Sequence, residues 1–299
     1  MDRSGGGAVI ANTTRDYAVM ALRAALRAAA EILEVYRGGR DSGVELKDDR
    51  SPVTTADMRA HRCICDFLES AAPSIPIVSE EAAHESYDRR RRWTRFWLVD
   101  PLDGTKEFIK RNGEFTINIA LVDDGPEDSG GPVAGVVYAP LLHRAYVGVV
   151  GLGAWRVDLV PGEREQPATW DQLMAHAVKL PLEEGARSAR PFTVVASRSH
   201  MNRETERFIE ELRREHPDLR LILSGSALKL CLVAEGAADL YPRFGSSKEW
   251  DTAAGDAVCR AAGACVNEWP ARTPLRYNKR RLENPWFLAG RGAERGVRC

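Results

Sequence analysis

The sequence lacks the features of a membrane-spanning or secreted protein. No stretch approaches the roughly 20 apolar residues that a helix needs to cross a bilayer. The first residues, MDRSGGGAVIANTTRDYAVM, contain no basic segment followed by an apolar block, so they do not resemble a secretory signal. We therefore expect residues 1–14 to be a flexible leader and the protein to be cytoplasmic, with peripheral contact to the inner face of the membrane left open.

The sequence also has no CxxC cysteine pair and a net charge close to zero. The six cysteines are scattered and include no CxxC pair, which excludes zinc-type spacing and argues against a disulfide framework in a chain of 299 residues. We therefore expect the cysteines to be reduced. A formal net charge of −1 gives no whole-molecule attraction to nucleic acid or to a membrane. Local groups or bound metal must then hold any anionic substrate.

The first half of the chain predicts two helices followed by a sheet. Residues 15–37 carry apolar positions at helical spacing and end before Gly38 and Gly39, and a second helix is expected over about 54–70. Strands are then expected in RFWLVD, EFTINIALVD, PVAGVVYAP and RAYVGVVGLGAWRV, which are β-branched and aromatic runs bounded by Gly, Pro or Asp. Their hairpin-like spacing favours an antiparallel sheet.

The second half predicts strands that alternate with helices. The polar segment 158–190 is the expected boundary between two lobes of one domain, at about 15–190 and 191–299. The runs PFTVVAS, LRLILSG and ADLYPRF each precede a predicted helix, near 202–215, 226–236 and 251–262. Such alternation indicates a mixed or parallel sheet covered by helices, and the whole chain is therefore expected to have a mixed α/β fold.

The segment WLVDPLDGTKEFIKRNGEF carries the clearest chemical signal. An apolar strand ends at Asp100, and a turn at Pro101-Leu102 would bring Asp103 back to the same point. Carboxylates and a turn carbonyl are the oxygen ligands that Mg²⁺ prefers. Gly104 and Thr105 then open a predicted short helix, whose free N–H groups suit a phosphate oxygen. A turn without a ligand is the alternative that this motif alone leaves open.

Three further segments place carboxylates at strand ends or helix starts. Glu80 and Glu81 follow the apolar strand IPIVS, Asp251 follows Trp250, and Asp57 lies in SPVTTAD. Each has a structural alternative: surface acids for the glutamates, a helix cap for Asp251 and a helix-dipole partner for Asp57. The recurrence of the pattern in four segments favours a shared cation site.

Three motifs in order resemble the lithium-sensitive, Mg²⁺-dependent phosphatase superfamily that includes inositol monophosphatase. They are SEE at 79–81, DPLDGT at 100–105 and WDTAAG at 250–255. The segments SPVTTAD, TKEFIKRNGEF, SRSH and LKLCLVAEGAADLYPRFG further resemble its CysQ-type branch, the 3′(2′),5′-bisphosphate nucleotidases. The resemblance implies a layered αβαβα fold with a metal site between two lobes.

The resemblance also implies roles for particular residues. Two or three Mg²⁺ ions would be held by Glu80, Asp100, the Leu102 carbonyl, Asp103 and Asp251. Thr105, hydrogen-bonded to Asp57, would orient a water and accept its proton. The expected substrate contacts are Gly104, Thr105, Ser197, His200, Gly225, Lys229 and Asp251. For two of them an ordinary structural role is the alternative, namely a solvent-facing helix lysine for Lys229 and a helix cap for His200.

The resulting expectation is an enzyme that removes the 3′-phosphate of adenosine 3′,5′-bisphosphate, with the 5′-phosphosulfate analogue as a second candidate substrate. The alternatives are a polyol phosphatase of the inositol monophosphatase type and a non-catalytic protein that binds RNA or membrane through Arg89–Arg92. We interpret that arginine run as a solvated basic loop and expect no nucleic-acid partner. The segments 123–132 and 158–190 look longer than their usual counterparts and could reshape the site entrance. The sequence sets no oligomeric state.

Overall fold

The computed structural model describes residues 13–38, 54–123, 130–159, 166–182 and 190–292, and the backbone of 45–46 and 52–53. Most of the expected leader and the centre of the 123–132 loop lie outside the described residues. The described part of 158–190 is not wholly irregular, because it contains helix α5 (Trp170–Met174) and strand β9 (Ala177–Lys179).

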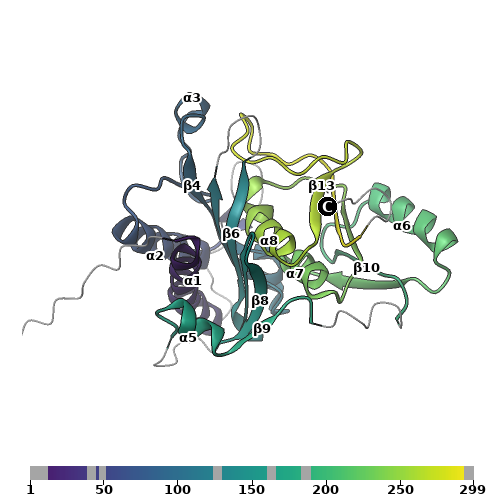
Figure 1. Ribbon diagram of the computed structural model, residues 1–299, viewed down its shortest axis with the longest axis horizontal. Coiled ribbons are helices and arrows are strands. Elements are labelled where there is room, and N and C mark those ends of the chain that lie inside the picture. The colour runs from purple at the N-terminus through teal and green to yellow at the C-terminus, as the bar shows by residue number, and fades with distance from the viewer. Residues whose placement is uncertain are drawn as a thin grey trace, which may run out of the picture.

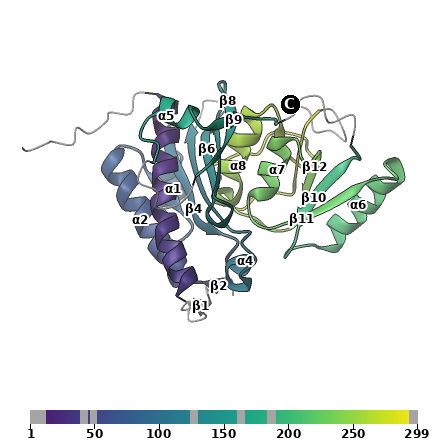
Figure 2. The ribbon, with the colours of Figure 1, turned by 90° about the horizontal axis from the view of Figure 1, so that it is seen from below.

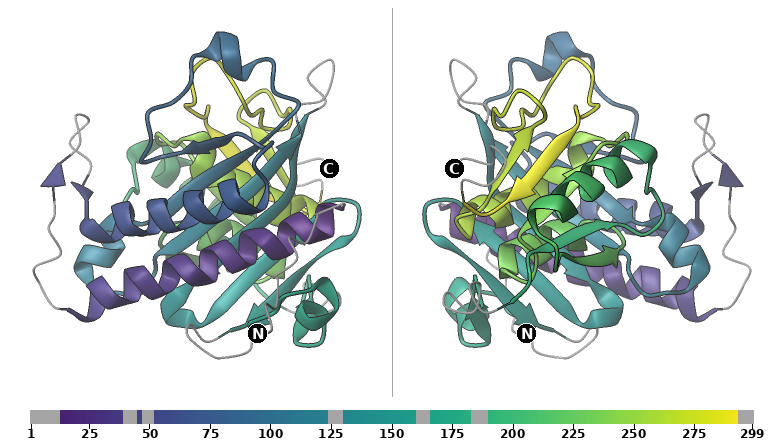
Figure 3. Two further views of the ribbon diagram at one scale, coloured as in Figure 1. Left: turned by 90° about the vertical axis from the view of Figure 1, so that its left-hand side faces the viewer. Right: turned by 90° about the vertical axis from the view of Figure 1, so that its right-hand side faces the viewer.

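Two long helices form the first layer. Helices α1 (Thr14–Arg37) and α2 (Thr55–Ala71) begin at threonine caps whose side chains accept backbone N–H groups, and each has an aspartate three residues later that completes the capping box. They lie side by side across one face of the large sheet (Figure 3). The spacing of apolar residues located both helices to within a residue or two.

The large sheet has seven strands in the order β3-β4-β5-β6-β7-β8-β9. Only the β3–β4 pair is parallel, so the predicted antiparallel sheet is confirmed for the central hairpins. The strands before β9 are β3 (Ile77–Ser79), β4 (Arg95–Asp103), β5 (Thr116–Asp123), β6 (Gly131–Ala139), β7 (Arg144–Val149) and β8 (Gly153–Asp158). Shorter elements are β1 (Glu45–Leu46), β2 (Pro52–Val53), α3 (Tyr87–Arg90), α4 (Thr105–Lys110) and the 3-10 helix η2 (Pro140–Leu142).

The second sheet has five strands in the order β11-β10-β12-β14-β13, and β10 runs parallel to both of its neighbours. Its elements in chain order are β10 (Thr193–Ser197), α6 (Arg203–Glu215), β11 (Arg220–Ser224), α7 (Leu228–Glu235), β12 (Leu240–Arg243), α8 (Glu249–Ala261), β13 (Cys265–Glu268) and β14 (Phe287–Gly290). Helices α7 and α8 lie between the two sheets, and α6 covers the outer face of the smaller one (Figures 1 and 2). The predicted αβαβα layering is therefore confirmed.

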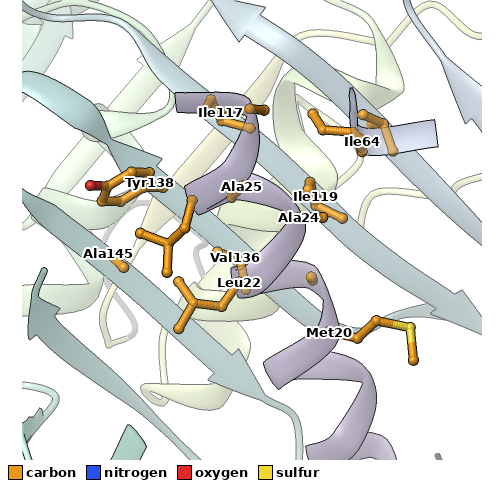
Figure 4. Packing of buried hydrophobic residues seen from close by; sticks show 14 of the residues in the cluster. Met20, Leu22, Ala24, Ala25, Ile64, Ile117, Ile119, Val136, Tyr138 and Ala145 are labelled. Carbon is orange, nitrogen blue, oxygen red and sulfur yellow. The ribbon is translucent and has the colours of Figure 1, made fainter. Parts of the chain in front are cut away.

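Apolar side chains fill the spaces between layers. Small residues of α1, such as Ala24 and Ala25, face the large sheet beside Ile119 and Val136 (Figure 4), and all four are completely buried. Because alanine is short, the helix can lie close to the strands. On the opposite face of the sheet, a second apolar cluster joins the strands to α7 and α8.

Two expectations about individual side chains are wrong, one about an arginine and one about a cysteine. Arg90 is buried, and its guanidinium donates to the Asn278 side chain at 2.8 Å and to the Lys279 carbonyl at 3.1 Å, so only the other arginines of the 89–92 run form an exposed basic loop. Cys265 is disulfide-bonded, although Cys63, Cys65, Cys231 and Cys259 have free thiols as expected. In the described residues, no helix is long and apolar enough to span a membrane.

Helix α8 approaches the large sheet through two glycines. A Cβ added at Gly135 would lie 2.4 Å from the Ala254 carbonyl oxygen, and one added at Gly148 would lie 2.6 Å from the Val258 Cα. The partners are helix backbone, which cannot move aside as a flexible side chain would. The absence of side chains at these positions therefore sets the depth at which α8 is seated.

We predict that Gly135→Ala lowers the free energy of unfolding by about 1–3 kcal/mol, the usual cost of overpacking a dense core. The matched control is Gly38→Ala, at a position with φ −65° where the added Cβ meets only ordinary contacts at 3.5 Å. This control is expected to lose less than about 0.5 kcal/mol. Urea denaturation of both variants measures the difference, and equal stabilities would contradict the assigned packing.

Candidate metal and phosphate site

Asp100 and Asp103 lie at the end of β4, in one continuous strand. The expected turn at Pro101-Leu102 is instead a bulge, because Asp100 pairs with Asn118 and Asp103 with Thr116 of β5 while the register shifts between them. The Leu102 N–H donates to the Asp100 carboxylate at 3.1 Å, and the Asn118 amide donates to Asp103 at 3.2 Å. The bulge therefore fixes both carboxylates without reversing the chain.

Three carboxylates from distant segments converge on one point. Oxygens of Glu80, Asp100 and Asp251 all lie within 4.8 Å of one another. Glu80 follows β3, which runs parallel to β4, and Asp251 lies in the first turn of α8, where it also accepts the Lys248 N–H at 2.9 Å. Asp251 therefore does cap α8, as the alternative expects, and its carboxylate also belongs to the cluster.

The electrostatics of this cluster call for a cation. Burial, followed by the charges of Glu80, Asp103 and Asp251, raises the pKa of Asp100 well above its ordinary value. Burial and the charges of Asp103 and Glu80 likewise raise the pKa of Asp251 to about 7. Like charges held this close repel unless a positive charge lies among them. The donor set, all oxygen, fits a hard divalent ion such as Mg²⁺.

Thr105 and Asp57 form the pair that the sequence predicts. The Thr105 hydroxyl lies 3.2 Å from Asp57 Oδ1 and 3.4 Å from the Leu102 carbonyl oxygen. Asp57 is almost completely buried, and its other oxygen accepts the Thr54 N–H at 2.8 Å and the Thr54 hydroxyl at 2.5 Å. Asp57 therefore caps α2 and orients Thr105 at once. Gly104, just before α4, has φ +93°, which glycine adopts readily.

The carboxylates line a cavity of about 940 Å³. Cationic and polar groups from the region of the second sheet line the same cavity. Lys229 is buried there rather than facing solvent, and its ammonium donates to the carbonyl oxygens of Ser224 and Ser226. Burial lowers the pKa of Lys229 to about 8, even though the Asp103 charge acts in the opposite direction.

Ser197 and His200 stand at the rim of the same cavity. Ser197 ends β10, and its hydroxyl accepts the His200 N–H at 3.1 Å. His200 Nε2 accepts a hydrogen bond from the Lys106 ammonium at 3.1 Å. Although part of His200 is exposed, burial of its ring and the charges of Arg243 and Lys106 lower its pKa to about 4, which keeps it neutral. The cap of α6 is Asn202, so His200 does not have that alternative role.

Gly225 is placed differently from the other expected contacts. Its N–H donates to the Glu114 carboxylate at 2.8 Å, and it is not among the residues that line the cavity. Its neighbour Ser226 does line the cavity, with φ 47° and a buried hydroxyl that has no hydrogen-bond partner in the described structure. An unsatisfied buried hydroxyl in such a place suits a ligand oxygen.

Sequence reasoning missed Ser226, Arg243 and Lys106, all of which line the cavity. Two features of the sequence could have indicated these residues. Arg243 ends β12, and Ser226 closely follows the end of β11, so both lie at the carboxyl ends of strands in a sheet with parallel pairs, where ligands commonly bind. Lys106 directly follows the DPLDGT motif on α4, whose first turn faces the cavity.

The αβαβα stack with an acidic cavity between its sheets defines a known class, the inositol monophosphatase family. The chain matches that family over residues 14–293 and belongs to it. Among its relatives, the 3′(2′),5′-bisphosphate nucleotidase CysQ of Escherichia coli K12 is 46% identical over 264 residues, which cover 88% of this chain and 95% of the relative.

Solved structures agree with this assignment. The crystal structure of CysQ from Bacteroides thetaiotaomicron matches with a TM-score of 0.83 and 44% identity, and covers 94% of this chain and 99% of that one. The inositol monophosphatase TM1415 of Thermotoga maritima matches with a TM-score of 0.67 at 23% identity, over 94% of this chain and 92% of that one. The second match supports the fold alone.

We predict that Asp100→Asn stabilises the protein in the presence of a chelator. Because the folded protein raises the pKa of Asp100, ionising this carboxyl at pH 8 costs folding free energy. Removing the charge should return about 1 kcal/mol or more, since one pKa unit corresponds to roughly 1.4 kcal/mol. Chemical denaturation in EDTA at pH 8 measures the change.

The same variant should respond less to metal. A cation that binds only the folded protein stabilises it by mass action. Mg²⁺ at about 10 mM, on the order of a weak site's Kd, should therefore raise the unfolding midpoint of the wild type more than that of Asp100→Asn. A variant that is less stable in EDTA and gains as much from Mg²⁺ as the wild type would count against the metal site.

Proposed function

We propose that the protein is a Mg²⁺-dependent phosphomonoesterase that hydrolyses the 3′-phosphate of adenosine 3′,5′-bisphosphate to AMP. One observation carries this proposal, namely that carboxylates and cationic side chains line the same cavity. A phosphate in this cavity would be held by metal ions on the carboxylates and by the cationic side chains. The 46% identity to a CysQ relative, named as a 3′(2′),5′-bisphosphate nucleotidase, supports the same substrate class.

In this proposal two or three Mg²⁺ ions are held by carboxylate and carbonyl oxygens of the first lobe and of α8. The ligands would be Glu80, Asp100, the Leu102 carbonyl, Asp103 and Asp251. When bound, such ions supply positive charge to phosphate oxygens and lower the pKa of a nearby water. The protein's own contribution is to keep the carboxylates of Glu80, Asp100 and Asp251 within 4.8 Å of one another before any ion arrives.

Thr105 and Asp57 would handle the proton of the attacking water. Asp57 Oδ2 accepts hydrogen bonds from Thr54, and Asp57 Oδ1 accepts one from the Thr105 hydroxyl. A water that donates to Thr105 Oγ1 can pass its proton through that hydroxyl to Asp57. Thr105 would at the same time orient the water, since its position is fixed by α4. No covalent attachment of the phosphate to the protein is required.

The second lobe would hold the nucleotide. Ser197, neutral His200 and Lys229 are proposed to contact the adenosine monophosphate part, together with Gly104, Thr105 and Asp251 at the scissile phosphate. Ser226 and Arg243 join this set because they line the same cavity. We propose that the lobes, about 15–190 and 191–299, act as one phosphatase domain whose two parts meet across the substrate. The 5′-phosphosulfate analogue fits the same arrangement.

Phosphate release from adenosine 3′,5′-bisphosphate, inositol 1-phosphate and fructose 1,6-bisphosphate tests this proposal. We expect a strong preference for the bisphosphate nucleotide, which Asp103→Asn or EDTA abolishes. A preference for inositol 1-phosphate would keep the metal site and contradict the nucleotide assignment. No release from any of the three would favour a non-catalytic protein.

Lys229→Met distinguishes the two enzyme classes. A hydrogen bond to a charged group contributes about 1.5–3 kcal/mol, so kcat/KM for the bisphosphate should fall about 10- to 100-fold while inositol 1-phosphate is affected far less. The control is Lys179→Met, which removes an exposed lysine at the end of β9. Equal losses on both substrates would contradict the proposed nucleotide contact.

A further inference from the structure

The loops that carry the proposed nucleotide contacts pack directly against the segment that follows the DPLDGT motif. A Cβ added at Gly225 would lie 2.7 Å from the Glu114 carbonyl oxygen and 2.8 Å from Glu107 Cγ. These distances leave no room for a side chain. The loop after β11 is therefore seated on the residues between α4 and β5, which belong to the other lobe.

Glu114 joins both loops of the second lobe to the first. Its carboxylate accepts two hydrogen bonds from the Arg198 guanidinium, both at 2.8 Å, and one from the Gly225 N–H at 2.8 Å. Arg198 also donates to the Leu223 carbonyl at 2.7 Å. One side chain of the first lobe thus connects the loop after β10 with the loop after β11.

The charge of Glu114 is maintained by these partners. Burial acts to raise its pKa, but the hydrogen bonds from Arg198 and the Gly225 N–H outweigh burial and hold the pKa below its ordinary value. Bidentate carboxylate–guanidinium contacts fix orientation as well as distance. Glu114 is not among the residues that line the cavity, so this carboxylate is not aimed at the substrate.

A second contact also joins the loop after β10 to the first lobe. The Ser199 hydroxyl donates to the buried Glu107 carboxylate at 2.5 Å, and the Lys110 ammonium donates to Ser199 at 3.4 Å. In each loop, the residues that contact the first lobe are sequence neighbours of residues that line the cavity. Arg198 and Ser199 stand between Ser197 and His200, and Gly225 precedes Ser226.

We propose that Glu114 is a positioning residue that fixes loops 197–200 and 224–229 against the first lobe and thereby sets the affinity for the nucleotide part of the substrate. This inference rests on the proposed function, because it assigns a task to residues around the proposed nucleotide contacts. Glu114 does not line the cavity that holds the carboxylate cluster, so the chemistry on the phosphate is left intact when the loops loosen.

The test is a KM-against-kcat comparison on Glu114→Gln, which keeps the size of the side chain and removes its charge. The KM for adenosine 3′,5′-bisphosphate should rise about tenfold, the change expected for weakened charge-assisted hydrogen bonds, while kcat stays within about twofold. Hydrolysis of p-nitrophenyl phosphate, which has no nucleotide to contact the loops, should keep its kcat/KM within about twofold.

A double-mutant cycle with Arg198→Gln shows whether the effect belongs to this contact. Since both changes break the same pair, the double variant should raise KM by less than the two single variants combined, and close to the more strongly affected single variant. Glu210→Gln is the matched control, because Glu210 is an exposed glutamate of α6 that pairs with Arg213 at 3.6 Å, and its KM should equal that of the wild type.

The outcomes separate this inference from the proposed function. An unchanged KM in Glu114→Gln, or parallel losses of kcat/KM on both substrates, would overturn the inference while leaving the wild-type activity as evidence for the function. Additive effects in the double variant would also overturn it. A wild-type protein that hydrolyses p-nitrophenyl phosphate but not the bisphosphate nucleotide would contradict the proposed function and the inference together.

Discussion

The structure is organised around the repulsion between carboxylates held close together. Glu80, Asp100 and Asp251 have oxygens within 4.8 Å of one another, and burial makes the ionised forms of Asp100 and Asp251 still less favourable. Such an arrangement costs stability unless a cation neutralises it. The fold must therefore resist the tendency of these groups to move apart, and it does so by placing them on rigid strand ends and on a helix whose depth is fixed by Gly135 and Gly148.

The charged groups of the cavity come from two sets of elements. Strand ends of the large sheet and α8 supply the carboxylates, while α7, the end of β12 and the loop after β10 supply Lys229, Arg243 and the neutral His200. A phosphorylated ligand in this cavity would contact both sets. Contacts between the two sets of elements, such as Glu114 with Arg198, help to fix their relative position.

Local sequence signals predicted the elements and much of the site, but not the partners of single residues. Apolar spacing and the Gly38-Gly39 pair predicted α1, and carboxylates at strand ends and helix starts predicted the carboxylate cluster. The burial of Arg90 escaped detection because its partner Asn278 lies 188 residues away. The sequence predicts a turn between Asp100 and Asp103 where the structure has a bulge, because Asp, Pro and Gly favour both and only pairing with β5 decides between them. Neither the disulfide at Cys265 nor the engagement of Gly225 by Glu114 has a local signature.

Anomalous scattering from crystals grown with Mn²⁺ in place of Mg²⁺ tests the central claim most directly, because it locates cations independently of activity. The account predicts at least one peak within about 2.3 Å of carboxylate oxygens of Glu80, Asp100 and Asp251, a distance suited to hard divalent ions. In Asp100→Asn crystals under the same conditions this peak should weaken or vanish. Wild-type crystals with no manganese among these carboxylates would contradict the account.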